Sequence, residues 1–104
     1  MKQNLIMLNK SEEIKKEFKT KKLRVVITAK RLVVEDADMS FSIRLDMIGV
    51  VQLIKRKGKK YDLRLYSKAG KDLFPFLKNY RMEFLDREDA ILFENILSSL
   101  ILMD

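Results

Sequence analysis

Short runs in which apolar and polar residues alternate cover most of the chain between residues 23 and 84. This period of two residues is typical of β-strands that bury one face. The first two runs, 23–27 and 32–34, are separated by the connecting residues Ala29 and Lys30. This spacing predicts two antiparallel strands joined as a hairpin.

Four further strands are predicted after an Asp-rich turn at 35–39. They are 41–45, 48–54, 61–65 and a short last strand at 80–84. In the first of them, Phe41, Ile43 and Leu45 are expected to face inward while the residues between them face solvent. The basic segment 55–60 is expected to form the tip of a long antiparallel hairpin.

The hydrophobic period becomes helical after Asp86. Asp86 is a good N-cap, and Glu88 and Asp89 suit the positive end of a helix. The apolar residues that recur at helical spacing are Ala90, Phe93, Leu97, Leu100 and Ile101. The pattern predicts a capping helix over 86–103. Polar residues interrupt it well short of the ~20 apolar residues that a membrane span requires, so we do not expect it to cross a membrane.

Residues 12–19 fit either a strand or a helix. Ile14 and Phe18 are four residues apart, and Asn9 with Glu12 resembles a capping box, which favours a helix. Tertiary contacts can nevertheless draw such a segment into a sheet. A strand is our prediction for this segment.

The 104 residues of the chain suffice for one domain, 1–104, with one hydrophobic core. Apolar residues make up 47% of it, which is the composition of a globular chain. The absence of cysteine and histidine removes disulfides, thiol nucleophiles, imidazole catalysis and zinc-finger ligation.

Residues 1–10 are interpreted as an N-terminal extension. Their apolar group is shorter than the apolar core of a signal peptide. We therefore expect a cytoplasmic protein.

Two short sequence motifs lie in the predicted strand region. One is Thr-x-x-Arg-Leu within 27–34, and the other is Ile-x-Leu-x-x-Ile within 42–48. With the order of elements, they resemble pleckstrin-homology-like (PH-like) domains of the GRAM or bacterial PH type, over nearly the whole chain. The resemblance implies an α+β, mainly β fold: a bent antiparallel sheet or partly open barrel of about seven strands, capped by one C-terminal helix. Two features depart from the family: 73–79 is longer and more apolar than a minimal member needs, and the helix lacks the tryptophan of many eukaryotic PH domains.

Two basic clusters are candidates for anion binding, and the net charge of +7 favours anionic partners. They consist of Lys19, Lys21, Lys22 and Arg24, and of Lys55, Arg56, Lys57, Lys59 and Lys60. In phosphoinositide-binding PH domains, basic residues flank the first inter-strand loop and end in a basic-x-basic step, which 22–24 resembles. The alternative interpretation is that the first cluster is an ordinary solvated surface, and that the charged 55–60 tip keeps its hairpin soluble and discourages edge pairing.

Two apolar groups are candidate partner interfaces. They are Phe74 and Phe76 in one segment, and Ile91, Leu92 and Ile96 on the predicted helix. Pro75 denies one backbone donor to a sheet, so 73–79 is expected to be an edge or a loop. The helical group widens the apolar stripe beyond what one core covers, which favours self-association. The alternatives are that the aromatic pair belongs to the core, and that 5–8 packs on the helix.

These observations predict a non-enzymatic interaction module for protein binding or self-assembly, with a homo-oligomer expected. No catalytic residue, metal site or cofactor is predicted, because the carboxylates fall in turns or at the helix start. The first alternative is peripheral binding to anionic lipid or phosphoinositide headgroups through the basic clusters. The second alternative is a nucleic-acid-associated protein, which the lack of aromatic residues within the basic clusters disfavours.

Overall fold

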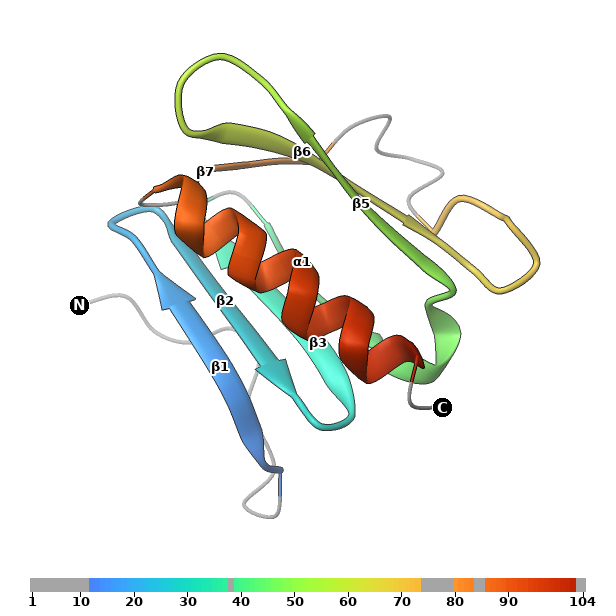
Figure 1. The fold of residues 1–104 in the computed structure, drawn as a ribbon. Helices are drawn as coiled ribbons and strands as arrows, with labels where there is room; N and C mark the ends of the chain where they lie inside the picture. Colours follow the sequence, from blue (N-terminus) through green and yellow to red (C-terminus); the bar gives the residue numbers. More distant parts are fainter. Residues whose placement is uncertain (1–11, 38, 74–79, 84–85, 103–104) are drawn as a thin grey trace.

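Seven strands and one helix make up the computed structural model, which describes residues 12–37, 39–73, 80–83 and 86–102 (Figure 1). The elements are β1 (Ile14–Lys19), β2 (Leu23–Thr28), β3 (Arg31–Asp36), β4 (Ser40–Arg44), the 3-10 turn η1 (Leu45–Met47), β5 (Val50–Lys55), β6 (Lys60–Tyr66), β7 (Tyr80–Glu83) and α1 (Arg87–Leu102). The strands form two antiparallel sheets, in the orders β1-β2-β3-β4 and β5-β6-β7. The predicted class, mainly β with one C-terminal helix, is confirmed.

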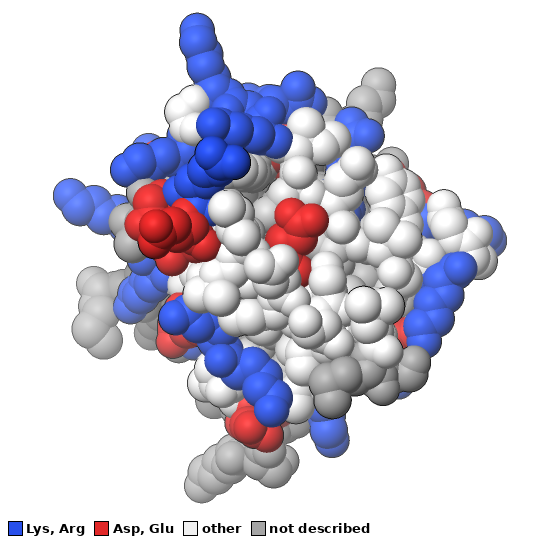
Figure 2. Space-filling model, in the orientation of Figure 1, with Lys and Arg blue, Asp and Glu red and all other residues white. Residues whose placement is uncertain are grey.

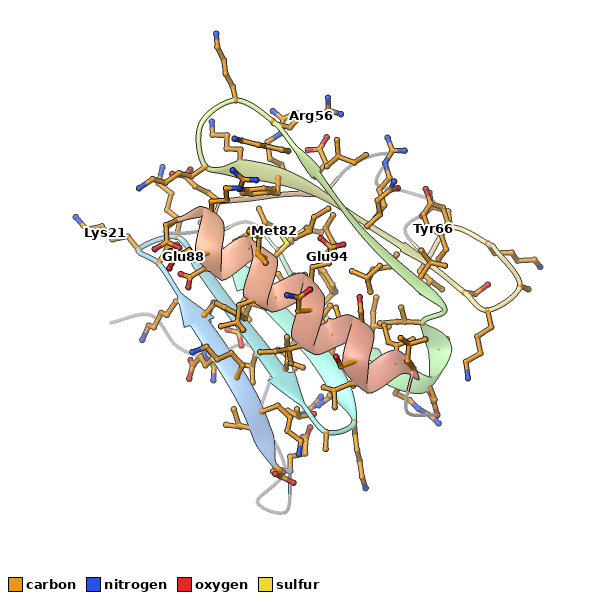
Figure 3. The ribbon with its side chains drawn as sticks, viewed as in Figure 1. Lys21, Arg56, Tyr66, Met82, Glu88 and Glu94 are labelled. Carbon is orange, nitrogen blue, oxygen red and sulfur yellow. The ribbon has the colours of Figure 1, made fainter. Side chains whose placement is uncertain are left out.

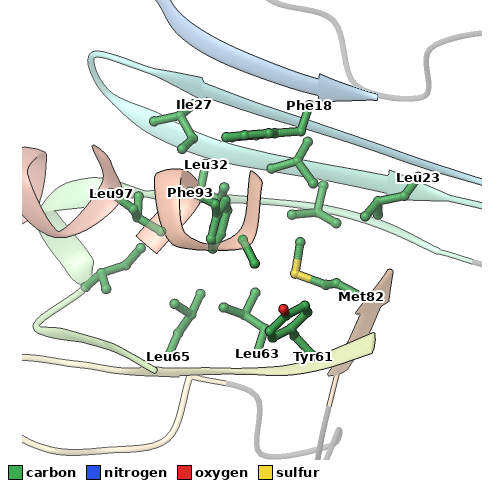
Figure 4. Packing of buried hydrophobic residues seen from close by; sticks show 14 of the residues in the cluster. Phe18, Leu23, Ile27, Leu32, Tyr61, Leu63, Leu65, Met82, Phe93 and Leu97 are labelled. Atoms are coloured by element: carbon green, nitrogen blue, oxygen red, sulfur yellow. The ribbon is translucent and has the colours of Figure 1, made fainter. Parts of the chain in front are cut away.

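The core lies between the two sheets and α1 (Figure 4). Ile27 and Leu32 come from the first sheet, Leu63 and Leu65 come from the second, and Phe93 of α1 lies between them. All five side chains are almost completely buried, and burial of each stabilises the fold by about 1.5–3 kcal/mol. The helix therefore fills the corner that two inclined sheets leave open, as Figure 1 shows.

The helix begins where the sequence predicted. The backbone N–H of Asp89 donates a hydrogen bond to Asp86 Oδ1 at 2.9 Å, so Asp86 is the N-cap. The predicted inward residues are buried, except that Leu100 is only partly so. The described part of α1 ends at Leu102, and residue 103 lies outside the described residues. No helix in the described ranges is both long and apolar enough to cross a membrane.

Residues 12–19 are mostly strand, because β1 covers Ile14–Lys19. The predicted hairpin of β2 and β3 is also confirmed, and the hydroxyl of Thr28 organises its turn. Thr28 Oγ1 accepts hydrogen bonds from the backbone N–H groups of Lys30 and Arg31 at 3.1 and 2.9 Å. The sequence pattern therefore located the turn of this hairpin correctly.

Three predicted boundaries in the middle of the chain were wrong. The expected turn at 35–39 begins later, because Glu35 and Asp36 belong to β3. Leu45 is not in a strand: Ile48 N–H donates to Leu45 O at 3.1 Å and closes the 3-10 turn η1. The next strand consequently starts at Val50 rather than at residue 48. Leu45 and Ile48 are still buried, so alternation identified their burial but not their backbone conformation.

The outer face of β2 and β3 is buried as well as the inner face. Val26 and Val33 are register partners on this outer face, and neither side chain is exposed. Ion pairs flank them: Arg24 binds Glu35 at 3.0 Å, and Arg31 Nη2 binds Glu12 at 2.7 Å. Alternation predicted only one buried face here, because the sequence pattern does not show that these charged residues, which are distant in sequence, pair with one another.

Candidate anion-binding site

A pocket of about 560 Å³ opens where the two sheets meet at one end of the molecule. Its walls come from the β1–β2 turn, the end of β3, the start of β6, and β7. Four cations line it: Lys21, Lys22, Lys60 and Arg81. Leu23 and Met82 supply buried apolar surface in the same pocket. The site thus combines positive charge at its walls with an apolar base.

The β1–β2 turn presents Lys21 and Lys22. Thr20 builds this turn, because its Oγ1 accepts a hydrogen bond from Leu23 N–H at 3.0 Å and its N–H donates to Leu23 O at 2.8 Å. Both lysines are exposed, and Figure 3 shows Lys21 projecting away from the turn. Neither lysine forms an ion pair with any residue that the structure describes.

The opposite wall comes from the second sheet. Lys60 begins β6 and pairs across the sheet with Glu83 of β7, while Asp62 pairs with Arg81. Lys60 and Arg81 are both exposed. The register of β6 and β7 therefore places two cations, more than twenty residues apart in sequence, at the same pocket.

Asp62 is a buried carboxylate that anchors two arginines. Its side chain has no exposed surface, and it binds Arg56 Nε at 2.6 Å and Arg81 Nε at 3.2 Å. Burial alone would raise the pKa of Asp62, but the hydrogen bonds from Arg56 and Arg81 outweigh burial and hold this pKa below its ordinary value. Asp62 is therefore ionised at neutral pH.

Positive charge predominates at the pocket. Its lining includes two carboxylates, Asp36 and Glu83, against the four cations, which leaves an excess of two positive charges. Asp36 Oδ1 accepts a hydrogen bond from Met39 N–H at 2.8 Å, so this carboxylate is engaged in the β3–β4 turn. Figure 2 shows most Lys and Arg side chains of the visible face gathered at one end, with a smaller acidic group beside them, while the face over α1 is mostly uncharged. An anion would meet a favourable potential at this end.

The structure divides the predicted basic residues into two groups. Lys21, Lys22 and Lys60 line the pocket, whereas the other candidates do not. Those outside it are Lys19, Arg24, Lys55, Arg56, Lys57 and Lys59. Arg24 is held by Glu17 at 2.8 Å and by Glu35 at 3.0 Å, so its guanidinium stabilises the first sheet.

Of the four cations that line the pocket, Arg81 is the one that the sequence did not identify. Alternation around Tyr80 and Met82 indicates that Arg81 faces away from the core, but an isolated arginine in a short strand carries no further signal. Its role depends on Asp62, nineteen residues earlier, through the register of β6 and β7. Only the folded chain brings these two residues together.

The apolar interface candidates lie elsewhere. Phe74 and Phe76 fall outside the described residues. On α1, Ile91 is 48% exposed and Leu92 is 39% exposed, whereas Ile96 is partly buried and packs against the core. The outer face of the helix therefore retains apolar surface, but less than the three predicted residues implied.

The described residues contain no group of three acidic side chains that could hold a metal ion. Comparison of the sequence with known family models and with curated proteins gave no match.

Proposed function

We propose that this protein is a non-enzymatic, PH-like interaction module that attaches peripherally to anionic lipid headgroups. The observation that carries the proposal is the convergence of Lys21, Lys22, Lys60 and Arg81, from both sheets, on one pocket. The arrangement favours this function over self-assembly, because a single pocket collects residues from both halves of the fold. The two-sheet domain with its C-terminal helix is compatible with a PH-like fold of the GRAM or bacterial type.

Physical chemistry supports a phosphate-bearing headgroup as the ligand. A phosphate group accepts several charge-assisted hydrogen bonds at once, from lysine ammonium groups and from an arginine fork. The hairpin cations Lys55, Lys57 and Lys59 add positive charge outside the pocket. Each lysine close to an anionic membrane contributes on the order of 1 kcal/mol. The pocket would hold one headgroup while the hairpin strengthens attraction to the surface.

The contacts of the acidic side chains also support binding rather than catalysis. Asp62, Glu35 and Glu12 are each paired with arginine, and Asp86 caps α1. Of these, Asp62 has its pKa held below the ordinary value, so it is a poor proton acceptor at neutral pH. These four acidic residues thus have structural partners.

Vesicle sedimentation tests the proposal. Phosphatidylcholine vesicles containing phosphatidic acid are expected to pellet the protein at low salt, and vesicles of phosphatidylcholine alone are not. The double variant Lys21→Glu, Lys22→Glu should lose this pelleting. The matched control is Lys68→Glu, Lys71→Glu, which makes the same change in net charge in the turn after β6, outside the pocket. Equal losses in both variants would show attraction by net charge alone and would reject the pocket as the site.

A second candidate function is self-assembly through α1. The observation that favours it is the exposed apolar surface of Ile91, Leu92 and Leu102, of which Leu102 is 83% exposed. Exposed apolar groups that lie on one helix are a common feature of interfaces. The corresponding test compares the mass in solution of the parent protein with that of a variant whose outer helix face is charged.

A further inference from the structure

Asp62 occupies a position at which a charge is costly. It lies on the outward-facing side of β6, between Lys60, which is exposed, and Arg64, which is partly buried, yet Asp62 itself has no exposed surface. Burying an ionised carboxylate costs several kcal/mol unless partners compensate it. Two arginines do so here, and they reach Asp62 from opposite sides, because β6 is the central strand of its sheet.

The two arginines differ in what else they contact. Both bind Asp62 through Nε, but Arg81 lines the pocket and Arg56 does not. A guanidinium has five N–H donors in one plane, of which Nε supplies one. A hydrogen bond from Nε to a buried carboxylate therefore restricts the orientation of the group. The terminal nitrogens of Arg81 have no hydrogen-bond partner among the described residues.

We infer that Asp62 is a positioning residue for the anion site: it holds Arg81 so that the two terminal nitrogens present a bidentate fork to a phosphate monoester. The inference rests on the proposed function and adds to it the chemistry of the recognised group. Two parallel N–H···O bonds suit a phosphate with several free oxygens. Lys21 and Lys22 would neutralise the same phosphate from the opposite wall of the pocket.

The arrangement also explains why arginine rather than lysine is needed at position 81. A lysine has one nitrogen, so an ammonium group that bound Asp62 would be drawn away from the pocket. An arginine contacts Asp62 and a ligand at the same time with different nitrogens. Arg81→Lys therefore preserves the charge of the pocket but removes the fork.

The test measures the affinity for phosphatidylcholine vesicles containing phosphatidic acid in five proteins: the parent, Arg81→Ala, Asp62→Asn, the double variant of these two, and Arg56→Ala. Loss of two charge-assisted hydrogen bonds is expected to lower the affinity of Arg81→Ala and of Asp62→Asn by about tenfold or more. Because Asp62 acts through Arg81, the double variant should bind no more weakly than Arg81→Ala. Arg56→Ala is the matched control, since it removes the other partner of Asp62 and the same positive charge, and it should weaken binding much less than Arg81→Ala does.

Three outcomes would overturn the inference. They are equal losses in Arg56→Ala and Arg81→Ala, additive losses in the double variant, and binding by Asp62→Asn at the parent affinity. If Asp62→Asn fails to fold by circular dichroism, Arg81→Lys decides instead: about tenfold weaker binding supports the fork, and parent affinity rejects it. If the double variant Lys21→Glu, Lys22→Glu loses binding while Arg81→Ala binds like the parent, this inference is rejected and the proposed function stands. A parent protein that does not bind the vesicles would reject the proposed function as well.

Discussion

Phe18 of β1 and Phe93 of α1 pack edge to face, with ring centroids 6.1 Å apart and an interplanar angle of 69°. This geometry is favoured by aromatic pairs, because the positive edge of one ring meets the negative face of the other. Phe18 belongs to an edge strand of the first sheet, so the contact joins the first described strand to the last element of the fold. The helix thus secures the outermost strand as well as the centre of the core.

Replacing Phe93 by alanine should therefore destabilise the fold severely. The side chain is completely buried, and its loss is expected to lower the free energy of unfolding by about 3–5 kcal/mol. Urea denaturation measures the change. Asn95→Ala, at an exposed position of the same helix, is the control and should change the stability by less than about 0.5 kcal/mol. Similar losses in both variants would mean that the helix does not complete the core.

The main elements of the fold were predictable because their signals are local. The helical spacing of Phe93 and Leu97, together with the N-cap Asp86, suffices to identify α1 from the order of residues alone. The division of the strands between two sheets carries no such signal. It depends on β4 ending at η1, where Leu45 N–H donates to Lys30 O at 2.8 Å, a contact between residues fifteen positions apart.

The candidate site was predictable only in part, because the contacts that select its cations join residues distant in sequence. Lys21 and Lys22 follow a strand end and were identified from sequence as exposed cations. The same reasoning selected Arg24, because charge alone does not reveal that Glu35 lies opposite on the neighbouring strand and holds it. Which cations remain available for a ligand depends on strand register, and register is a property of the folded sheet.

Truncation of Arg24 should lower the stability of the fold, whereas truncation of Lys22 should weaken vesicle binding. Glu35 is buried, so Arg24→Ala leaves its carboxylate without its arginine partner and is expected to lower the free energy of unfolding by about 1–3 kcal/mol. Lys22 is exposed and unpaired among the described residues, so Lys22→Ala should leave stability unchanged while weakening vesicle binding. Denaturation and sedimentation of the two variants check this. Unchanged stability in Arg24→Ala would contradict the structural role given to this arginine.

Gly49 should tolerate no larger residue. A Cβ atom built at Gly49 would lie 2.7 Å from the Cα of Lys68 and 2.8 Å from the carbonyl oxygen of Ser67, and both are backbone atoms that cannot rotate away. Gly49→Ala is expected to destabilise the fold by about 1–3 kcal/mol through this overlap. Gly70→Ala is the comparison, because Gly70 has open space around it but a φ of +83°. Its cost should be limited to about 1 kcal/mol of backbone strain, and thermal unfolding of the two variants compares them.

Self-assembly through α1 predicts a smaller species when the outer face of the helix becomes charged. Ile91→Glu, Leu92→Glu places two carboxylates at exposed positions, so the fold should persist while an apolar interface would be lost. Static light scattering of the parent and of this variant measures the mass. Asn95→Glu is a control that adds charge on the same helix without removing apolar surface. An unchanged mass in the double variant would reject this face as an interface.

The buried carboxylate of Asp62 should make stability depend on pH in the acid range. Its folded-state pKa is held below the ordinary value of 3.8, so the unfolded chain binds a proton more readily than the folded chain does. The stabilisation is therefore fully present above the ordinary pKa and is lost as the pH falls below it toward the folded-state pKa. Asp62→Asn removes this contribution at every pH.

The parent should accordingly be more stable than Asp62→Asn at pH 7, and the difference should shrink as the solution is acidified below about pH 4. Urea denaturation of both proteins at several pH values measures it. Arg44 and Asp46 form an ion pair whose partners are both exposed, so Asp46→Asn is the control and should show little difference from the parent at any pH. A difference between the parent and Asp62→Asn that stays constant down to pH 3 would mean that the two arginines do not hold Asp62 in its ionised form, and that Arg81 lacks the fixed charge against which it is oriented.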